Sequence, residues 1–243
     1  MHDFLKEDMI INFNNLISRT DFIKTIIAVM QELQTAYKGP VDIEFASDGN
    51  DLYLLQCRPQ SKTLHGEKVK IPSNIPQHSK IFSASKFVNN GIVNNIEYVV
   101  YVDCQAYKSL KTAEEMKTTG SIIGKLNSVL PKRKFILIGP GRWGSKGDIK
   151  LGVPVIYSDI NNTAMLIEVA RIDGGYLPEV SFGTHFFQDL VEANIKYLPL
   201  YPDNEGNIMN ENFFQVVKNS LPEILPDYTE YQNVVKVIKV DDF

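Results

Sequence analysis

This 243-residue sequence has only two cysteines and one tryptophan, and basic residues do not outnumber acidic ones. Cys57 and Cys104 have no C-x-x-C neighbour, which excludes a disulfide framework or a zinc ribbon and fits a reducing cytoplasm. No apolar run is long enough to span a membrane, and the opening MHDFLKEDMI does not resemble a signal peptide. The net charge of −4 argues against general nucleic-acid binding. We therefore expect a cytoplasmic protein with neither a membrane nor a nucleic acid as partner.

The first ordered region that the sequence predicts is a helix followed by a hairpin. Apolar residues recur at three- and four-residue steps over residues 14–37, which indicates one amphipathic helix that Gly39 and Pro40 end. Two apolar-rich runs then flank the turn residues 47–50, a pattern typical of a β-hairpin over residues 41–59. We expect the apolar face of the hairpin to pack on the helix.

The organisation of the remaining chain predicts a second domain. Residues 62–80 are polar and proline-rich without apolar periodicity, and we interpret them as a linker between residues 1–61 and 81–243. The second region mixes strand and helix patterns without the regular alternation of a doubly wound sheet, so we predict an α+β protein whose second domain is mixed α/β. The expected strands lie within residues 96–104, 134–138, 163–172 and 233–240, and the expected helices within 112–130, 184–195 and 210–221.

Four polar side chains of the hairpin share one face if its loop has an odd number of residues, for instance 48–50. Asp42, Glu44, Gln56 and Arg58 then point to the same side. A glutamate supplies a hard oxygen ligand for Mg²⁺, and an arginine offers a planar fork for phosphate oxygens. The alternative is a solvated hairpin face on which Glu44 and Arg58 form a weak exposed pair.

The hairpin also resembles a known family. A helix followed by DIEF at residues 42–45 and LQCRP at residues 55–59 is similar to the end of the ATP-grasp nucleotide-binding domain of phosphoenolpyruvate synthases and pyruvate phosphate dikinases. The resemblance covers residues 14–61 and implies a Mg-ATP site. It implies that Glu44 ligates Mg²⁺ and that Gln56 and Arg58 contact the phosphates.

The sequence departs from this family in ways that predict a fragment. We find no upstream glycine-rich ATP loop, no Gly-Gly-x-Thr-Ser-His signature and no room for a pyruvate-binding barrel. We expect the chain to be part of a phosphoenolpyruvate-synthase-like phosphotransferase that is inactive alone. An upstream part of the same protein would complete the ATP site, and a small molecule such as pyruvate would accept the phosphoryl group. The alternative is a non-catalytic ligand- or partner-binding module that retains the hairpin.

A glycine-rich loop, IGPGRWGS, follows the strand predicted at residues 134–138. Its G-x-G-x-x-G spacing matches a dinucleotide fingerprint, but no helix pattern follows, which excludes that interpretation. Gly141, Arg142, Gly144 and Ser145 remain candidates for holding a phosphate through inward N–H groups and side-chain donors. The alternative is a structural turn with Trp143 as its packing anchor.

A histidine at a predicted helix start is the candidate catalytic residue. Gly183, Thr184 and His185 open the helix of residues 184–195, which is similar to the place of the phosphorylated histidine in phosphohistidine domains. The second domain would then be a remodelled domain of that kind, with His185 as phosphocarrier. The alternative is a helix-capping segment. Aromatic residues near the C-terminus, in YLPLYP and DYTEYQ, fit either a homodimer interface or core packing.

Overall fold

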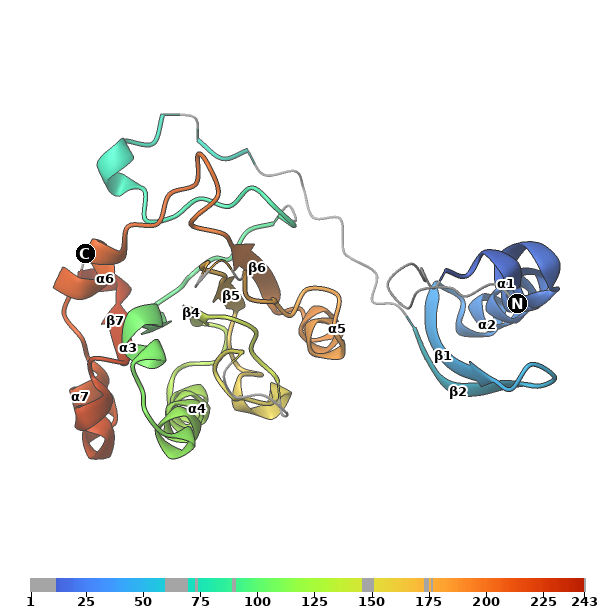
Figure 1. The fold of residues 1–243 in the computed structure, drawn as a ribbon. Coiled ribbons are helices and arrows are strands. Elements are labelled where there is room, and N and C mark those ends of the chain that lie inside the picture. Colours follow the sequence, from blue (N-terminus) through green and yellow to red (C-terminus); the bar gives the residue numbers. More distant parts are fainter. Residues whose placement is uncertain are drawn as a thin grey trace, which may run out of the picture. The chain divides into compact units, whose positions relative to one another are not determined.

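The computed structural model describes residues 12–59, 70–88, 91–145 and 151–242, except Ser73, Asp173, Gly174 and Tyr176. The chain separates into two compact units, Met1–Lys62 and Thr63–Phe243, which we call the N-terminal and C-terminal units (Figure 1). Residues 62–69 and Ser73 of the predicted linker lie outside the described residues. Cys57 and Cys104 are both free thiols.

The N-terminal unit consists of two helices and a two-stranded antiparallel sheet. These are α1 (Asn14–Arg19), α2 (Phe22–Tyr37), β1 (Val41–Ser47) and β2 (Leu52–Pro59). The single helix predicted over residues 14–37 is wrong, because Thr20 is extended and divides it. The Thr20 hydroxyl donates to the Leu16 carbonyl and accepts from the Phe22 amide, so one side chain joins the two helix ends.

The hairpin loop differs from the predicted one. Ser47 pairs with Leu52, which leaves four residues, 48–51, in the loop. Asp48 Oδ1 accepts from the amides of Asn50 at 2.9 Å and Asp51 at 2.8 Å, which stabilises this longer turn. The register then shifts by one residue between Glu44 and Phe45. This β-bulge restores the pairing parity that an odd loop would give.

Apolar side chains of the N-terminal unit stay largely uncovered. No residue of α2 is buried, although the Phe22 and Phe45 rings lie 5.6 Å apart and join helix to hairpin. Beyond the bulge Phe45 pairs with Leu54, so the apolar face of Ile43 continues through Leu54 and not through Tyr53. Leu55 is 64% exposed. We call the exposed apolar side chains of this unit the open apolar surface: Phe13, Leu16, Ile17, Ile23, Ile27, Tyr37, Phe45, Tyr53, Leu54 and Leu55.

The C-terminal unit is built on a five-stranded sheet in the order β6-β5-β4-β3-β7. Strands β3 to β6 are parallel, and β7 pairs antiparallel with β3. The strands are β3 (Tyr98–Val102), β4 (Phe135–Pro140), β5 (Met165–Val169), β6 (Lys196–Leu200) and β7 (Val235–Lys239). Because parallel neighbours follow the chain order, the loops after β4 and β5 leave the same edge of the sheet.

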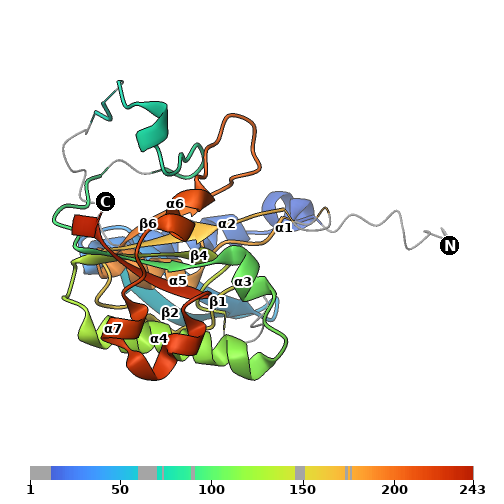
Figure 2. The ribbon, with the colours of Figure 1, turned by 90° about the vertical axis from the view of Figure 1, so that its left-hand side faces the viewer.

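Helices cover both faces of this sheet. The face that includes Leu137 and Leu166 packs on α4, α5 and α7, whereas the face that includes Ile138 and Ile167 packs on α6 (Figure 2). The remaining helical segments are short. The bounds are α3 (Cys104–Lys108), α4 (Ala113–Val129), α5 (His185–Glu192), α6 (Glu211–Val216) and α7 (Leu221–Ile224), with 3-10 segments at Gln77–Ser79, Tyr157–Asp159, Pro226–Tyr231 and Val240–Asp242.

The predicted α+β class is confirmed, with one strand missed. β6 contains Pro199, which argues against a central strand but is tolerated here because β6 lies at the sheet edge. Tyr197 and Tyr201 are buried, so these aromatic residues take part in core packing. No helix within the described ranges has the length and apolarity needed to cross a membrane.

Candidate functional site

The hairpin brings together the four polar residues that the sequence singled out. Glu44 lies directly across from Gln56, and Asp42 lies directly across from Arg58. Side chains of directly paired residues project from the same face of a sheet. The bulge lies beyond these pairs and leaves them on one side, so the geometric expectation for this face is met.

A contact on this polar face orients the guanidinium group of Arg58. When the Gln56 amide is oriented with its oxygen toward Arg58, which satisfies both groups, that oxygen accepts from Arg58 Nη2 at 2.7 Å and from Nε. Gln56 and Arg58 are half-buried, whereas Glu44 is exposed. No group of three or more His, Cys, Asp or Glu side chains in the described part of the chain is arranged to hold a metal ion.

In the glycine-rich loop after β4, three successive backbone amides already donate hydrogen bonds to other groups of the protein. Gly141 N donates to Val169 O at 3.0 Å, Arg142 N donates to Leu151 O at 2.8 Å, and Trp143 N donates to Glu168 Oε1 at 2.8 Å. These three amides therefore do not form the inward anion cradle that we considered. The Ser145 hydroxyl is buried and has no hydrogen-bond partner within the described structure. Phosphate binding by this loop stays a prediction that depends on side chains.

Packing explains two of the glycines in this loop. Gly141 has φ +66°, and a Cβ at this residue would lie 1.8 Å from the Leu151 carbonyl oxygen. Gly144 has φ +73°, and its Cβ would overlap the Phe186 ring. Both positions therefore require glycine for backbone conformation and for close approach. The turn brings the loop against Phe186 in α5.

A buried carboxyl group, which the sequence did not predict, joins the glycine-rich loop after β4 to the segment that follows β5. Glu168 on β5 is 0% exposed and accepts from Trp143 N, from Ser181 N at 2.6 Å and from Tyr197 Oη at 2.6 Å, and its Oε1 also lies 2.6 Å from Ser181 Oγ. No cation is among these donors. Burial raises the pKa of Glu168, an effect that the hydrogen bonds of Ser181 and Tyr197 partly offset. An acidic residue inside the otherwise apolar run MLIEVA was the available signal.

The Ser181 hydroxyl indicates how the carboxyl group is satisfied. Ser181 Oγ lies 2.6 Å from Glu168 Oε1 and 2.9 Å from the Trp143 carbonyl oxygen, yet a hydroxyl carries one proton. Both contacts are hydrogen bonds when Glu168 is protonated, since Glu168 then donates to Ser181 and Ser181 donates to Trp143. This geometry agrees with the raised pKa of Glu168.

We expect the stability of the C-terminal unit to fall with rising pH through this group. A raised folded-state pKa means that the unfolded chain releases the proton first, so the contribution is full below the ordinary glutamate value and is lost as pH rises through the folded pKa. Urea unfolding followed at several pH values, with Glu168→Gln as the non-titrating reference, measures the effect. Parallel pH curves for the two proteins would contradict it.

His185 is the first residue of α5. Thr184 caps this helix, and its hydroxyl accepts from Phe187 N at 3.3 Å and donates to Ser181 O at 2.6 Å. The capping interpretation therefore has direct support in the contacts, whereas the phosphocarrier role of His185 stays a prediction. The structure brings His185 and Arg142 to one cavity of about 420 Å³, lined by Arg142, Trp143, Gly144, Gly183, Thr184, His185, Phe186 and Gln188.

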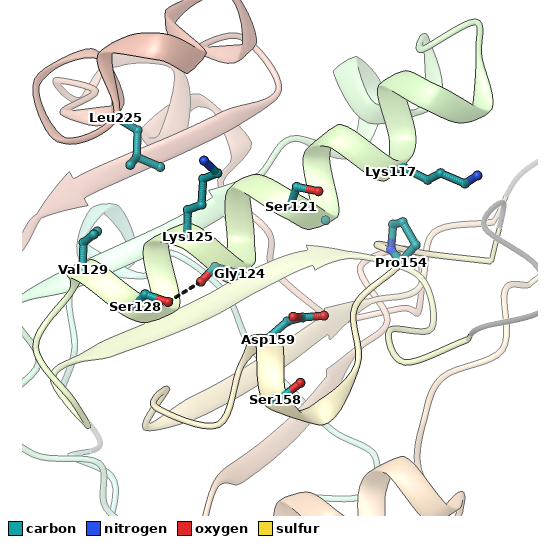
Figure 3. A pocket seen from close by; sticks show the side chains of 11 residues that line it. Lys117, Ser121, Gly124, Lys125, Ser128, Val129, Pro154, Ser158, Asp159 and Leu225 are labelled. Carbon is teal, nitrogen blue, oxygen red and sulfur yellow. Dashed lines mark hydrogen bonds between the residues drawn. The ribbon is translucent and has the colours of Figure 1, made fainter.

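A second and larger groove lies along α4 (Figure 3). Lys117, Ser121, Lys125 and Ser128 line its helical side, and Asp159 faces them from a 3-10 segment. Lys125 Nζ lies 5.0 Å from the centre of the Tyr228 ring. Gly120 of α4 has a packing role here, because a Cβ at this residue would overlap the Pro154 carbonyl oxygen. These contacts indicate that the groove forms where α4 packs against neighbouring loops.

Comparison with known proteins identifies the N-terminal part of the chain. Residues 6–79 match the family described as pyruvate phosphate dikinase, AMP/ATP-binding domain. Searches of curated proteins and of solved structures gave no match. The match includes the hairpin with Glu44, Gln56 and Arg58, and it confirms the resemblance that the sequence showed. The N-terminal unit is therefore related to the AMP/ATP-binding domain of the pyruvate phosphate dikinase and phosphoenolpyruvate synthase family.

Proposed function

We propose that the polar face of the hairpin forms one wall of a Mg-ATP site in a phosphotransferase of the phosphoenolpyruvate synthase type. The observation that supports this most directly is the pairing of Glu44 with Gln56 and of Asp42 with Arg58 on neighbouring strands. An acid, an amide and a guanidinium on one face suit a nucleotide with its metal ion. The match to an AMP/ATP-binding domain adds independent support.

Each residue has a separate role in this proposal. The Arg58 fork binds phosphate oxygens, and the Gln56 amide oxygen holds the guanidinium in place. Exposed Glu44 presents a carboxylate oxygen, which suits Mg²⁺. Mg²⁺ is usually held by one or two carboxylates together with water and substrate phosphates, so a lone glutamate fits it even without a protein cage.

In our proposal a further protein part completes the ATP site, and pyruvate serves as phosphoryl acceptor. One wall of polar side chains does not position a phosphoryl group for in-line transfer. The open apolar surface of the N-terminal unit is consistent with such a part, because exposed apolar side chains of this number suit a contact with another protein segment. The chain alone would then bind Mg-ATP weakly without turning it over.

We expect the purified chain to release no phosphate from Mg-ATP above the buffer rate, while Mg-ATP shifts the backbone amide resonances of the hairpin. Arg58→Ala should weaken this binding about tenfold, since it removes charge-assisted hydrogen bonds to phosphate. Amide-resolved NMR titration measures the affinity, and a phosphate-release assay measures turnover.

Asp51→Asn is the matched control, because Asp51 is an exposed carboxylate on the loop of the same hairpin. Its affinity for Mg-ATP should equal that of the unmodified chain. Equal affinity in Arg58→Ala, or resonance shifts confined to other residues, would refute the hairpin site. Turnover that Glu44→Ala abolishes would refute the requirement for a further part.

A second candidate function is a non-catalytic ligand-binding module. The observation that favours it is the cavity between Arg142 and His185, which is formed entirely by residues of the C-terminal unit. Residues 80–243 also lie outside the family match. In this case ligand binding would persist when the hairpin residues are replaced.

A further inference from the structure

The cavity of the C-terminal unit lies where a parallel sheet usually binds its ligands. The loop after β4 supplies Arg142, Trp143 and Gly144. The segment after β5 supplies the other lining residues, which are Gly183, Thr184, His185, Phe186 and Gln188. Both segments leave the carboxyl edge of the sheet, the side on which open α/β sheets bind small molecules. The volume of the cavity, about 420 Å³, is in the range of small-molecule sites.

Each wall of this cavity includes a source of positive charge. Arg142 lines one wall, and the N-terminus of α5, with its partial positive charge, lines the other. The partner of Arg142 is the Glu179 carboxylate, which is 2.7 Å from Nη1 and 61% exposed. Such an exposed ion pair contributes little, so an anionic ligand can displace Glu179 from the guanidinium at small cost.

The walls are fixed before any ligand arrives. Glu168 binds the Trp143 amide on one side and Ser181 on the other, which couples the two segments through one buried group. Gly144 contacts the Phe186 ring closely enough to exclude a Cβ. A site with preset walls loses little conformational entropy on binding.

We propose that this cavity binds a small organic phosphate, with Arg142 and the start of α5 on opposite sides of the phosphate group. Several oxygens of one tetrahedral anion can then accept from both walls at once. The cavity is larger than a single ion needs, and Phe186 provides an apolar surface for the organic part. The site is independent of the hairpin and of Glu44.

Two opposite substitutions at the ion pair test the proposal. Arg142→Ala should weaken phosphate binding about tenfold, because it removes the guanidinium. Glu179→Gln should strengthen binding, because it removes the competing carboxylate. The full chain is titrated with inorganic phosphate and with phenyl phosphate at constant ionic strength, and amide NMR shifts of Gly144 and Gly183 report the place of binding.

Lys117→Ala is the matched control, since Lys117 lines the other groove. It should bind both probes as the unmodified chain does, and so should Glu44→Ala, which separates this site from the proposed ATP site. Fluorescence of the single tryptophan without ligand verifies the fold of each variant. Unchanged affinity in Arg142→Ala, weaker binding in Glu179→Gln, or acetate binding as tightly as phosphate would overturn the proposal.

Discussion

Replacing Glu168 with leucine is expected to lower the free energy of unfolding of the C-terminal unit by about 3 to 5 kcal/mol. Leucine cannot accept the hydrogen bonds of Trp143 N, Ser181 N and Tyr197 Oη, which leaves three buried donors unsatisfied. Each orphaned donor costs about 1 to 3 kcal/mol. Relief from burying a carboxyl group offsets only part of this loss.

Urea unfolding followed by tryptophan fluorescence measures this effect, because Trp143 is the single tryptophan and lies in the C-terminal unit. Tyr197→Phe removes one of the donors and should cost about 1 kcal/mol. Glu205→Leu, a change at an exposed residue of the same unit, should have an effect near zero. A loss below about 1 kcal/mol in Glu168→Leu would show that the carboxyl group does not join the two loops.

The hairpin shows how far strand periodicity predicts a site. The shared face of Glu44, Gln56 and Arg58 follows from the side-chain alternation of two strands, together with the parity of their connection. We expected an odd-numbered loop, and the structure has a four-residue loop. The β-bulge shifts the register by one residue, so the same side chains still share a face. Hydrogen bonds of Asp48 and a local register shift decide these details, and apolar patterning does not contain them.

The cavity of the C-terminal unit was not predictable in the same way. Arg142 and His185 were each singled out, but only the parallel order of β4 and β5 places their loops at one edge of the sheet. That order depends on the long-range parallel pairing of β4 with β5. Glu168 was missed because a single acid in an apolar run carries no periodic signal.

The same limit applies to the glycine-rich loop, where spacing suggested a phosphate cradle and contacts indicate close packing. Arg142 N and Leu151 O form a hydrogen bond across the loop, and Gly141 pairs with Gly152 in an isolated bridge. A sequence motif shows which positions are glycine, but it does not show which atoms pack against those positions. Stability measurements on glycine variants separate the two explanations.

Gly141→Ala is expected to destabilise the C-terminal unit by about 3 kcal/mol or more, whereas Gly206→Ala should cost about 1 to 2 kcal/mol. Both glycines have positive φ, +66° and +80°, so an alanine is strained at either position. A Cβ at residue 206 meets nothing within 4 Å, but one at residue 141 overlaps the Leu151 carbonyl oxygen. The difference between the variants therefore measures the steric overlap alone. Ligand-free urea unfolding provides both values, and equal losses would indicate that Gly141 is required for something other than packing.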